Sequence, residues 1–251
     1  MGPVSDTSTG SPEAGENAEH RGEQHHGDVG GRLNWLRAGV LGANDGIVST
    51  AGLVMGVAGA TSDRTTIFTA GAAGLVAGAL SMAGGEYVSV STQRDTEQAL
   101  LEKERWELKH LPEQELEELA ELYEERGLTP ELAREVARQL TDKDALSAHA
   151  EVELGIDPDA LTSPWQAAWA SLVSFTVGAL LPLIVILLPP PSVRAWLCVG
   201  AVAVALAITG ATSAWLGSAH RRPAVVRNVA VGLLAMGVTY FVGTLVGGAT
   251  G

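Results

Sequence analysis

The chain has 251 residues, enough for one large or two modest domains, and a formal net charge of −13 at pH 7. Its single cysteine, Cys198, excludes an intrachain disulfide and any CxxC metal site. Almost all of the net negative charge lies in residues 94–159, where twenty Asp and Glu stand against eight Lys and Arg, a net of −12. We expect no nucleic-acid partner.

The N-terminal segment, residues 1–31, is rich in Gly, Ser, Glu and His and contains no apolar stretch. It lacks the apolar core of a signal peptide and the side chains needed for a folded core. We interpret it as a disordered cytoplasmic tail. Its histidines at positions 20, 25 and 26 are interpreted as part of that tail rather than as a metal site.

Five apolar stretches are each close to the length of about 20 residues that a helix needs to cross a bilayer. They cover residues 38–62, 66–90, 166–188, 195–217 and 224–248. Unbroken apolar runs of this length predict helices, because a helix satisfies all its backbone hydrogen bonds within lipid. The predicted fold is therefore all-α, with transmembrane helices 1–2 in residues 32–93 and helices 3–5 in residues 163–251.

The distribution of arginines predicts the orientation in the membrane, because basic residues accumulate on the cytoplasmic side. One side carries most of them and the other only two. The richer side holds Arg32, Arg37, Arg94, Arg221, Arg222 and Arg227; the poorer side holds Arg64 and Arg194. We therefore expect the N-terminus and residues 94–162 to be cytoplasmic. The composition fits a bacterial cell membrane better than a vacuole.

The first span is rich in glycine, with small-residue pairs at Gly42/Gly46 and Gly52/Gly56. Such pairs let two helix backbones approach closely in lipid. They are compatible with a homodimer contact and equally with packing inside one subunit.

Residues 94–162 are predicted to form an acidic insert of three helices. The first continues the second span to about His110, and the second begins at Pro112 and ends before Gly127. The third begins at Pro130, after a capping Thr129, and runs to about Leu154. Leucines and a valine at helical spacing should pack the last two helices together: Leu116, Leu119, Leu122, Leu132, Val136 and Leu140.

Two acids, Asp45 and Glu86, interrupt otherwise uncharged membrane helices. A carboxylate there is costly and usually faces a pathway or a partner. No Lys or Arg lies at the depth of Asp45, which excludes a buried ion pair. Asp45 is therefore either a pathway residue or a protonated acid that is hydrogen-bonded to a neighbouring helix. Glu86 is either a pathway residue or a structural residue at the membrane interface. Met82 precedes Glu86 by one turn and is either a soft metal ligand or a packing residue. Asn44 is included in the predicted pathway.

In the insert, Glu104/Glu107 and Glu115/Glu118 form i,i+3 pairs that antiparallel packing could bring together around a cation. The alternative is a solvated acidic face, partnered by Lys103, Arg105 and Lys109. His149 and Glu153, spaced i,i+4, could add nitrogen and oxygen ligands. Such a set suits Fe²⁺ or Mn²⁺, with Zn²⁺ also compatible.

Three stretches closely resemble the vacuolar iron transporter family. RAGVLGANDGIVSTAGLVMGVAGA (37–60) and SMAGGEYVSVSTQRD (81–95) resemble its first two spans, and DALSAHAEVELGID (144–157) resembles the end of its insert. The resemblance implies a homodimer that moves Fe²⁺ or Mn²⁺ out of the cytosol in exchange for protons.

On this resemblance Asp45 and Met82 match pathway ligands, with Glu86 nearby. Five acids match cytoplasmic metal ligands: Glu104, Glu107, Glu115, Glu118 and Glu153. The chain departs from the family at His149 and Ala150, where members can carry methionine ligands, so His149 is the candidate substitute.

The predicted function is therefore a proton-coupled exporter of divalent transition metals, not an enzyme. Fe²⁺ and Mn²⁺ are the expected cargo, Zn²⁺ and Co²⁺ further candidates, and no permanently bound cofactor is expected. The alternatives are a membrane-anchored ferroxidase and a metal-sensing scaffold. A di-iron site of the ferritin type needs two Glu-x-x-His motifs, and the chain has one, at Glu107 and His110.

Overall fold

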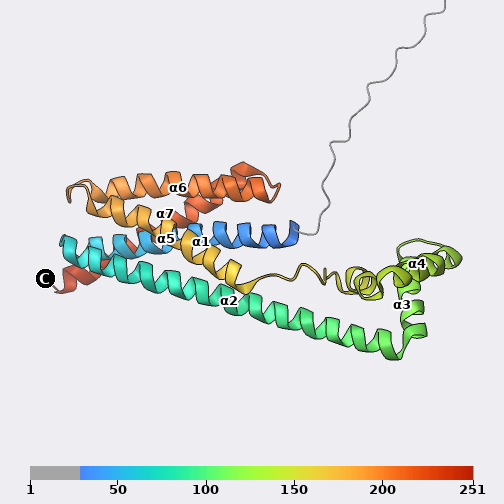
Figure 1. The fold of residues 1–251 in the computed structure, drawn as a ribbon. Coiled ribbons are helices and arrows are strands. Elements are labelled where there is room, and N and C mark those ends of the chain that lie inside the picture. Colours follow the sequence, from blue (N-terminus) through green and yellow to red (C-terminus); the bar gives the residue numbers. More distant parts are fainter. Residues whose placement is uncertain (1–28, 251) are drawn as a thin grey trace, which may run out of the picture.

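The computed structural model describes residues 29–250, and in that range all the regular secondary structure is helical, which confirms the all-α prediction (Figure 1). The elements are α1 (Val29–Ala60), α2 (Arg64–His110), α3 (Pro112–Glu125), α4 (Pro130–His149), the π-helical turn η1 (Ala150–Leu154), α5 (Pro164–Leu187), α6 (Arg194–Leu216) and α7 (Arg221–Thr250). The predicted tail and its three histidines lie outside the described residues, except that residues 29–31 form the first turn of α1.

Five helices, α1, α2, α5, α6 and α7, are long and apolar enough to cross a membrane, as predicted. Helix α1 is the centre of the bundle, because it contacts each of the other four. Its buried side chains Ile47, Val54 and Met55 form a common core with apolar residues of the other four helices. Each face of α1 therefore borders a different neighbour, and adjacent residues can line different cavities.

The glycine pairs of α1 pack within the subunit. A Cβ at Gly46 would overlap the carbonyl oxygen of Phe175 on α5, and one at Gly56 would lie 3.3 Å from the carbonyl oxygen of Thr239 on α7. Of the two uses that the sequence left open, these glycines serve packing between helices of one chain.

Helix α2 joins the membrane bundle to the insert without a break. It has 47 residues, and its first half is apolar whereas its second half is charged. At about 1.5 Å per residue it is about 70 Å long, roughly twice the thickness of a bilayer core. In Figure 1 it extends past the end of the bundle where α1 begins and carries α3 and α4 at its far end.

Prolines begin and glycines end the helices of the insert. Helix α3 begins at Pro112, and Gly127 and Gly155 end their helices with positive φ angles of 100° and 65°, where a side chain would be strained. Leu119 and Ala137 lie in the core between α3 and α4. Leu132, predicted to face this core, is exposed instead, because the small Ala133 and Ala137 occupy the contact.

The third insert helix is not continuous, contrary to the prediction. Asp144 has an extended backbone (φ −163°, ψ 93°) that breaks α4, and its Oδ1 accepts a hydrogen bond from the backbone N–H of Ser147 at 3.0 Å. An aspartate in this position caps a new helix start. The expected caps at Thr129 and Ser163 make no such side-chain bond.

We expect Gly243→Ala to destabilise the bundle by about 1–3 kcal/mol, the usual cost of overpacking. A Cβ at Gly243 of α7 would overlap the carbonyl oxygen of Gly56, which cannot move without shifting α1. Gly248→Ala, on the same helix with open space around it, is the matched control. Thermal unfolding of the purified protein in detergent measures both, and equal melting temperatures for the two variants would contradict the packing.

Candidate metal sites

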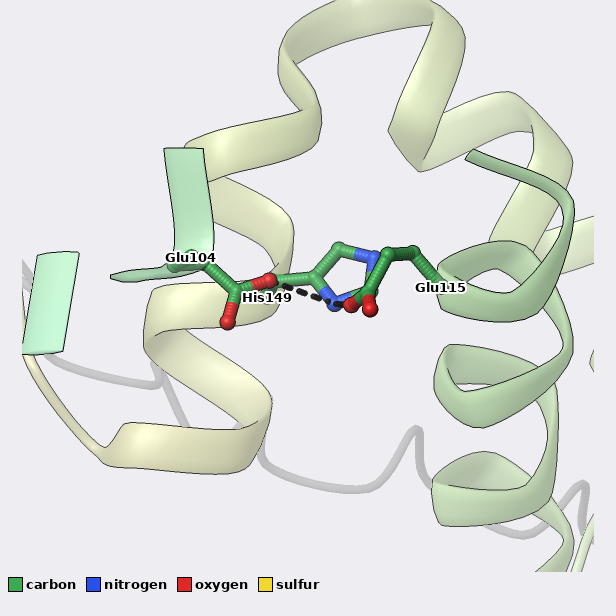
Figure 2. Close-up of side chains that lie close together, drawn as sticks. All are labelled: Glu104, Glu115 and His149. Carbon is green, nitrogen blue, oxygen red and sulfur yellow. Dashed lines mark ion pairs between the residues drawn. The ribbon is translucent and has the colours of Figure 1, made fainter. Parts of the chain in front are cut away.

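A buried histidine lies at the centre of the insert, surrounded by glutamates from three elements. Figure 2 shows the imidazole of His149, from the end of α4, between the carboxylates of Glu104 on α2 and Glu115 on α3. All three side chains are buried, and His149 is fully buried. Each residue offers an atom within 4.8 Å of the others, the spacing of ligands around one metal ion. The sequence-predicted pairing of α2 and α3 acids is therefore formed through Glu104 and Glu115.

Three carboxylates approach the same ring nitrogen. Nδ1 of His149 lies 3.1 Å from Oε1 of Glu104, 3.7 Å from Oε2 of Glu115 and 3.8 Å from Oε2 of Glu153. Among residues 29–250, no hydrogen bond is made to either ring nitrogen, to Oε1 of Glu104 or to Oε2 of Glu153, and all four atoms are buried. Buried polar atoms normally have partners, so this convergence of unpartnered donor atoms fits a bound cation.

The electrostatics of this group oppose a full negative charge in the absence of metal. Burial, and then the charges of Glu153 and Glu115, raise the pKa of Glu104 to about 7. Burial also raises the pKa values of Glu115 and Glu153, with the nearby Glu118 adding to both. Burial lowers the pKa of His149, which leaves its ring neutral and able to donate a lone pair to a metal.

The other predicted insert ligands lie at the edge of this group. Nζ of Lys103 lies 2.7 Å from Oε2 of Glu107 in an ion pair. This is the partner expected if Glu107 belongs to a solvated acidic face. Glu118 is exposed, and its charge acts on Glu104, Glu115 and Glu153. His110 is exposed and its Nδ1 lies 2.7 Å from the carbonyl oxygen of Trp106, so the Glu107-x-x-His110 motif does not converge with the buried group.

A second group of potential ligands lies in the membrane bundle. Asp45 of α1 and both Met82 and Glu86 of α2 line one cavity of about 390 Å³. Ser49 and Ser81 line it as well, and in the part of the chain that the structure describes no Lys or Arg does. The structure therefore brings together three of the four predicted pathway residues, in a setting with two carboxylates and one thioether.

Asn44, the fourth predicted pathway residue, faces another direction. Its Oδ1 accepts hydrogen bonds from Nδ2 of Asn228 at 2.7 Å and from Oγ1 of Thr209 at 3.2 Å. It therefore lies on the α6–α7 side of α1, whereas the neighbouring Asp45 lines the cavity beside α2.

Sequence reasoning missed how the insert group is positioned. Arg126 at the end of α3 donates a hydrogen bond to the carbonyl oxygen of Val152 at 2.8 Å. Val152 belongs to the π-helical turn η1, which follows His149 directly and carries Glu153. Such turns often occur at functional sites. The sequence contained one signal for the new helix start before His149: Asp144 lies three residues before Ser147, the spacing of a side-chain cap.

Comparison with known proteins identifies the family of this chain. A model of the VIT family matches residues 36–244. The chain belongs to the VIT family. This confirms the resemblance seen in the sequence and makes the chain an integral membrane protein of a transporter family.

Named relatives match nearly the whole chain. The vacuolar iron transporter of Acanthamoeba castellanii is 47% identical over 228 residues, which cover 89% of this chain and 83% of the relative. Vacuolar iron transporter homolog 1 of Oryza sativa is 39% identical, with 90% and 82% covered. Vacuolar iron transporter homolog 2.1 of Arabidopsis thaliana is 35% identical, with 91% and 89% covered.

We expect the metal-free insert to lose stability as the pH rises through 7. Glu104 ionises near its ordinary value of 4.5 when unfolded but at about 7 when folded, so the folded state holds the proton more tightly. The contribution of Glu104 to the free energy of unfolding is therefore fully present below pH 4.5 and is lost as the pH rises through 7. Glu104→Gln, which cannot ionise, should be more stable than wild type at pH 8.

Hydrogen exchange of residues 112–154 measures the stability of the insert in the full-length protein, with a chelator present. Exchange rates are recorded between pH 5.5 and 8 and corrected for the intrinsic pH dependence of exchange. Glu121→Gln, an exposed acid on α3, should keep the wild-type pH dependence. An unchanged pH dependence in Glu104→Gln would show that this carboxyl is not the group responsible.

Proposed function

We propose that the protein exports divalent iron, and also manganese, from the cytosol across a membrane in exchange for protons. The observation that carries the proposal is that one continuous helix, α2, bears two sets of metal-type ligands. Met82 and Glu86 share a cavity with Asp45 among the membrane helices, and Glu104 lies with Glu115 and His149 in the insert.

The choice of cargo rests on ligand chemistry and on the relatives. Carboxylates with one imidazole suit Fe²⁺ and Mn²⁺, and the thioether of Met82 favours transition metals over Mg²⁺ and Ca²⁺. The relatives that are named vacuolar iron transporters support iron. Zn²⁺ and Co²⁺ are further candidate substrates, and the proposal includes no permanently bound cofactor and no enzymatic activity.

The first step of the proposed mechanism is collection of metal by the insert. Its net charge of −12 across residues 94–159 attracts divalent cations over a range that salt shortens. Glu104, Glu115, His149 and Glu153 then bind the ion, with Glu107 and Glu118 adding negative charge at the edge of the site. His149 takes the place of methionine ligands that other family members can carry.

The second step moves metal from the insert toward the bundle along α2. Glu86 and Glu104 are eighteen residues apart, which is about 27 Å and about five whole turns, so both lie on one face of the helix. Gln93 and Glu97 fall on the same face, and Gln93 donates a hydrogen bond to Glu97 at 2.8 Å. A metal ion released from the insert therefore meets a polar helix face that leads to Glu86.

The third step is exchange for protons in the membrane cavity. Metal binds at Met82, Glu86 and Asp45, and protons from the opposite side neutralise the carboxylates and displace it. Because no Lys or Arg lines this cavity, the carboxylates need either a metal ion or protons to balance their charge. Asn44 contributes by fixing α1 against α6 and α7 beside Asp45.

The proposal includes a homodimer and a defined orientation. Leu41 and Leu53 at the cavity are 53% and 38% exposed, which is compatible with a second subunit that covers them and completes the pathway. The arginine distribution supports a cytoplasmic N-terminus and insert. The named relatives are eukaryotic, so the bacterial cell membrane expected from composition stays a prediction.

We expect Asp45→Asn to abolish metal uptake into proteoliposomes that are acidic inside, while binding of metal by the insert is retained. The amide cannot carry the negative charge that the proposed exchange requires. Glu102→Gln, an exposed acid on α2 that belongs to neither ligand group, should transport like wild type. Wild-type uptake by Asp45→Asn would mean that the ion follows another path.

We expect His149→Ala to lower the number or affinity of metal ions bound by the full-length protein, because the fully buried ring is the only nitrogen donor of the buried ligand group. Equilibrium dialysis with Mn²⁺ measures the stoichiometry. His110→Ala, which removes an exposed histidine near the end of α2, is the control. Unchanged stoichiometry and affinity in His149→Ala would remove this residue from the ligands.

A further inference from the structure

A second cavity of the bundle borders another face of α1 and shares Leu41 with the cavity that Asp45 lines. It has a volume of about 620 Å³ and is enclosed by α1, the end of α6 and the start of α7. Most of its wall is apolar, with Leu36, Val40 and Leu216 among its lining residues. The proposed metal pathway does not use this cavity, which contains no acidic residue.

The polar groups of this cavity are concentrated at two places. Arg37 of α1 and Arg227 of α7 both line it and both are exposed, so one cavity presents two positive charges. Deeper along α1, Asn44, Thr209 and Asn228 form a hydrogen-bonded group in which Nδ2 of Asn228 contacts Oγ1 of Thr209 at 3.0 Å. These three side chains bond to one another, and among the described residues no Asp or Glu lines the cavity to balance the charge of the two arginines.

The position of the arginines matches the level of lipid headgroups. Arg37 directly precedes the apolar stretch of residues 38–62 in α1, and Arg227 lies in the second turn of α7. Trp215 lies one residue before Leu216 at the end of α6 and is 63% exposed, as is Trp165 at the start of α5, on the same end of the bundle. Exposed tryptophans at helix ends mark the interface between water and lipid.

We propose that this cavity binds an anionic phospholipid, with the phosphate between Arg37 and Arg227 and an acyl chain against the apolar wall. Basic pockets between membrane helices at the headgroup level have the charge that anionic headgroups complement. A phosphate paired with two guanidinium groups makes strong charge-assisted hydrogen bonds. The apolar wall continues into a neighbouring cavity that shares Leu36 and Val40 and includes Trp165 and Trp169, which provides room for the chain.

Competition between two lipids tests the proposal on the purified full-length protein. Phosphatidylglycerol and phosphatidylcholine with identical acyl chains are offered in equal amounts, and native mass spectrometry counts the retained lipid. We expect wild type to prefer phosphatidylglycerol, and we expect each arginine to contribute about fivefold to this preference. Arg37→Gln/Arg227→Gln should lose it.

Arg221→Gln/Arg222→Gln is the matched control, because it removes the same charge from exposed positions of α7 that do not line the cavity. This double variant should keep the preference. Equal loss in both double variants would overturn the proposal in favour of general surface charge, and an unchanged preference in Arg37→Gln/Arg227→Gln would overturn it directly.

Two further outcomes would assign the cavity to another occupant and overturn the proposal. Full displacement of phosphatidylglycerol by inorganic phosphate would identify a site for the free anion. No lipid preference in wild type, together with a change of oligomeric state in Arg37→Gln/Arg227→Gln, would identify a contact between two copies of the chain.

Discussion

Carboxylates held away from water without a basic partner are the constraint on which this molecule depends. Glu104 and Glu115 are buried around His149, and Asp45 shares its cavity with Glu86 in a bundle of membrane helices. Ligand atoms of Glu104 and Glu115 lie within 4.8 Å of each other, and like charges that close repel strongly in a medium of low dielectric constant. The insert group therefore favours bound protons or a bound cation, the two states between which the proposed transport mechanism alternates.

Helix α2 couples the two groups because it is continuous. Its 47 residues place Glu86 and Glu104 on one face, about 27 Å apart, so neither site can contact an ion held by the other. In the proposed mechanism, metal passes between them by diffusion along a polar surface rather than by direct transfer. The insert would then supply metal to the membrane pathway, and its contribution should matter most when free metal is scarce.

The sequence predicted the helices well because their signals are local. Apolar runs of bilayer length, Pro112 and Pro130 at helix starts, and Gly127 and Gly155 at helix ends each act within a few residues. The direction of side chains was harder to predict. Asn44 and Asp45 are adjacent yet face different helices, and nothing in the local sequence shows which neighbour packs against which face of α1. The π-helical turn makes a tertiary contact, the hydrogen bond from Arg126 to Val152, that the local sequence does not reveal, whereas the kink at Asp144 carries a local cap on Ser147.

The most direct test of the account is to follow metal entry and lumenal pH together in proteoliposomes that are acidic inside, with Fe²⁺ or Mn²⁺ added outside. Exchange predicts that the lumenal pH rises in step with metal entry and that both changes stop when an ionophore dissipates the proton gradient. Metal entry that leaves the lumenal pH unchanged and continues without the gradient would contradict proton coupling. No entry of any divalent metal would contradict transport itself.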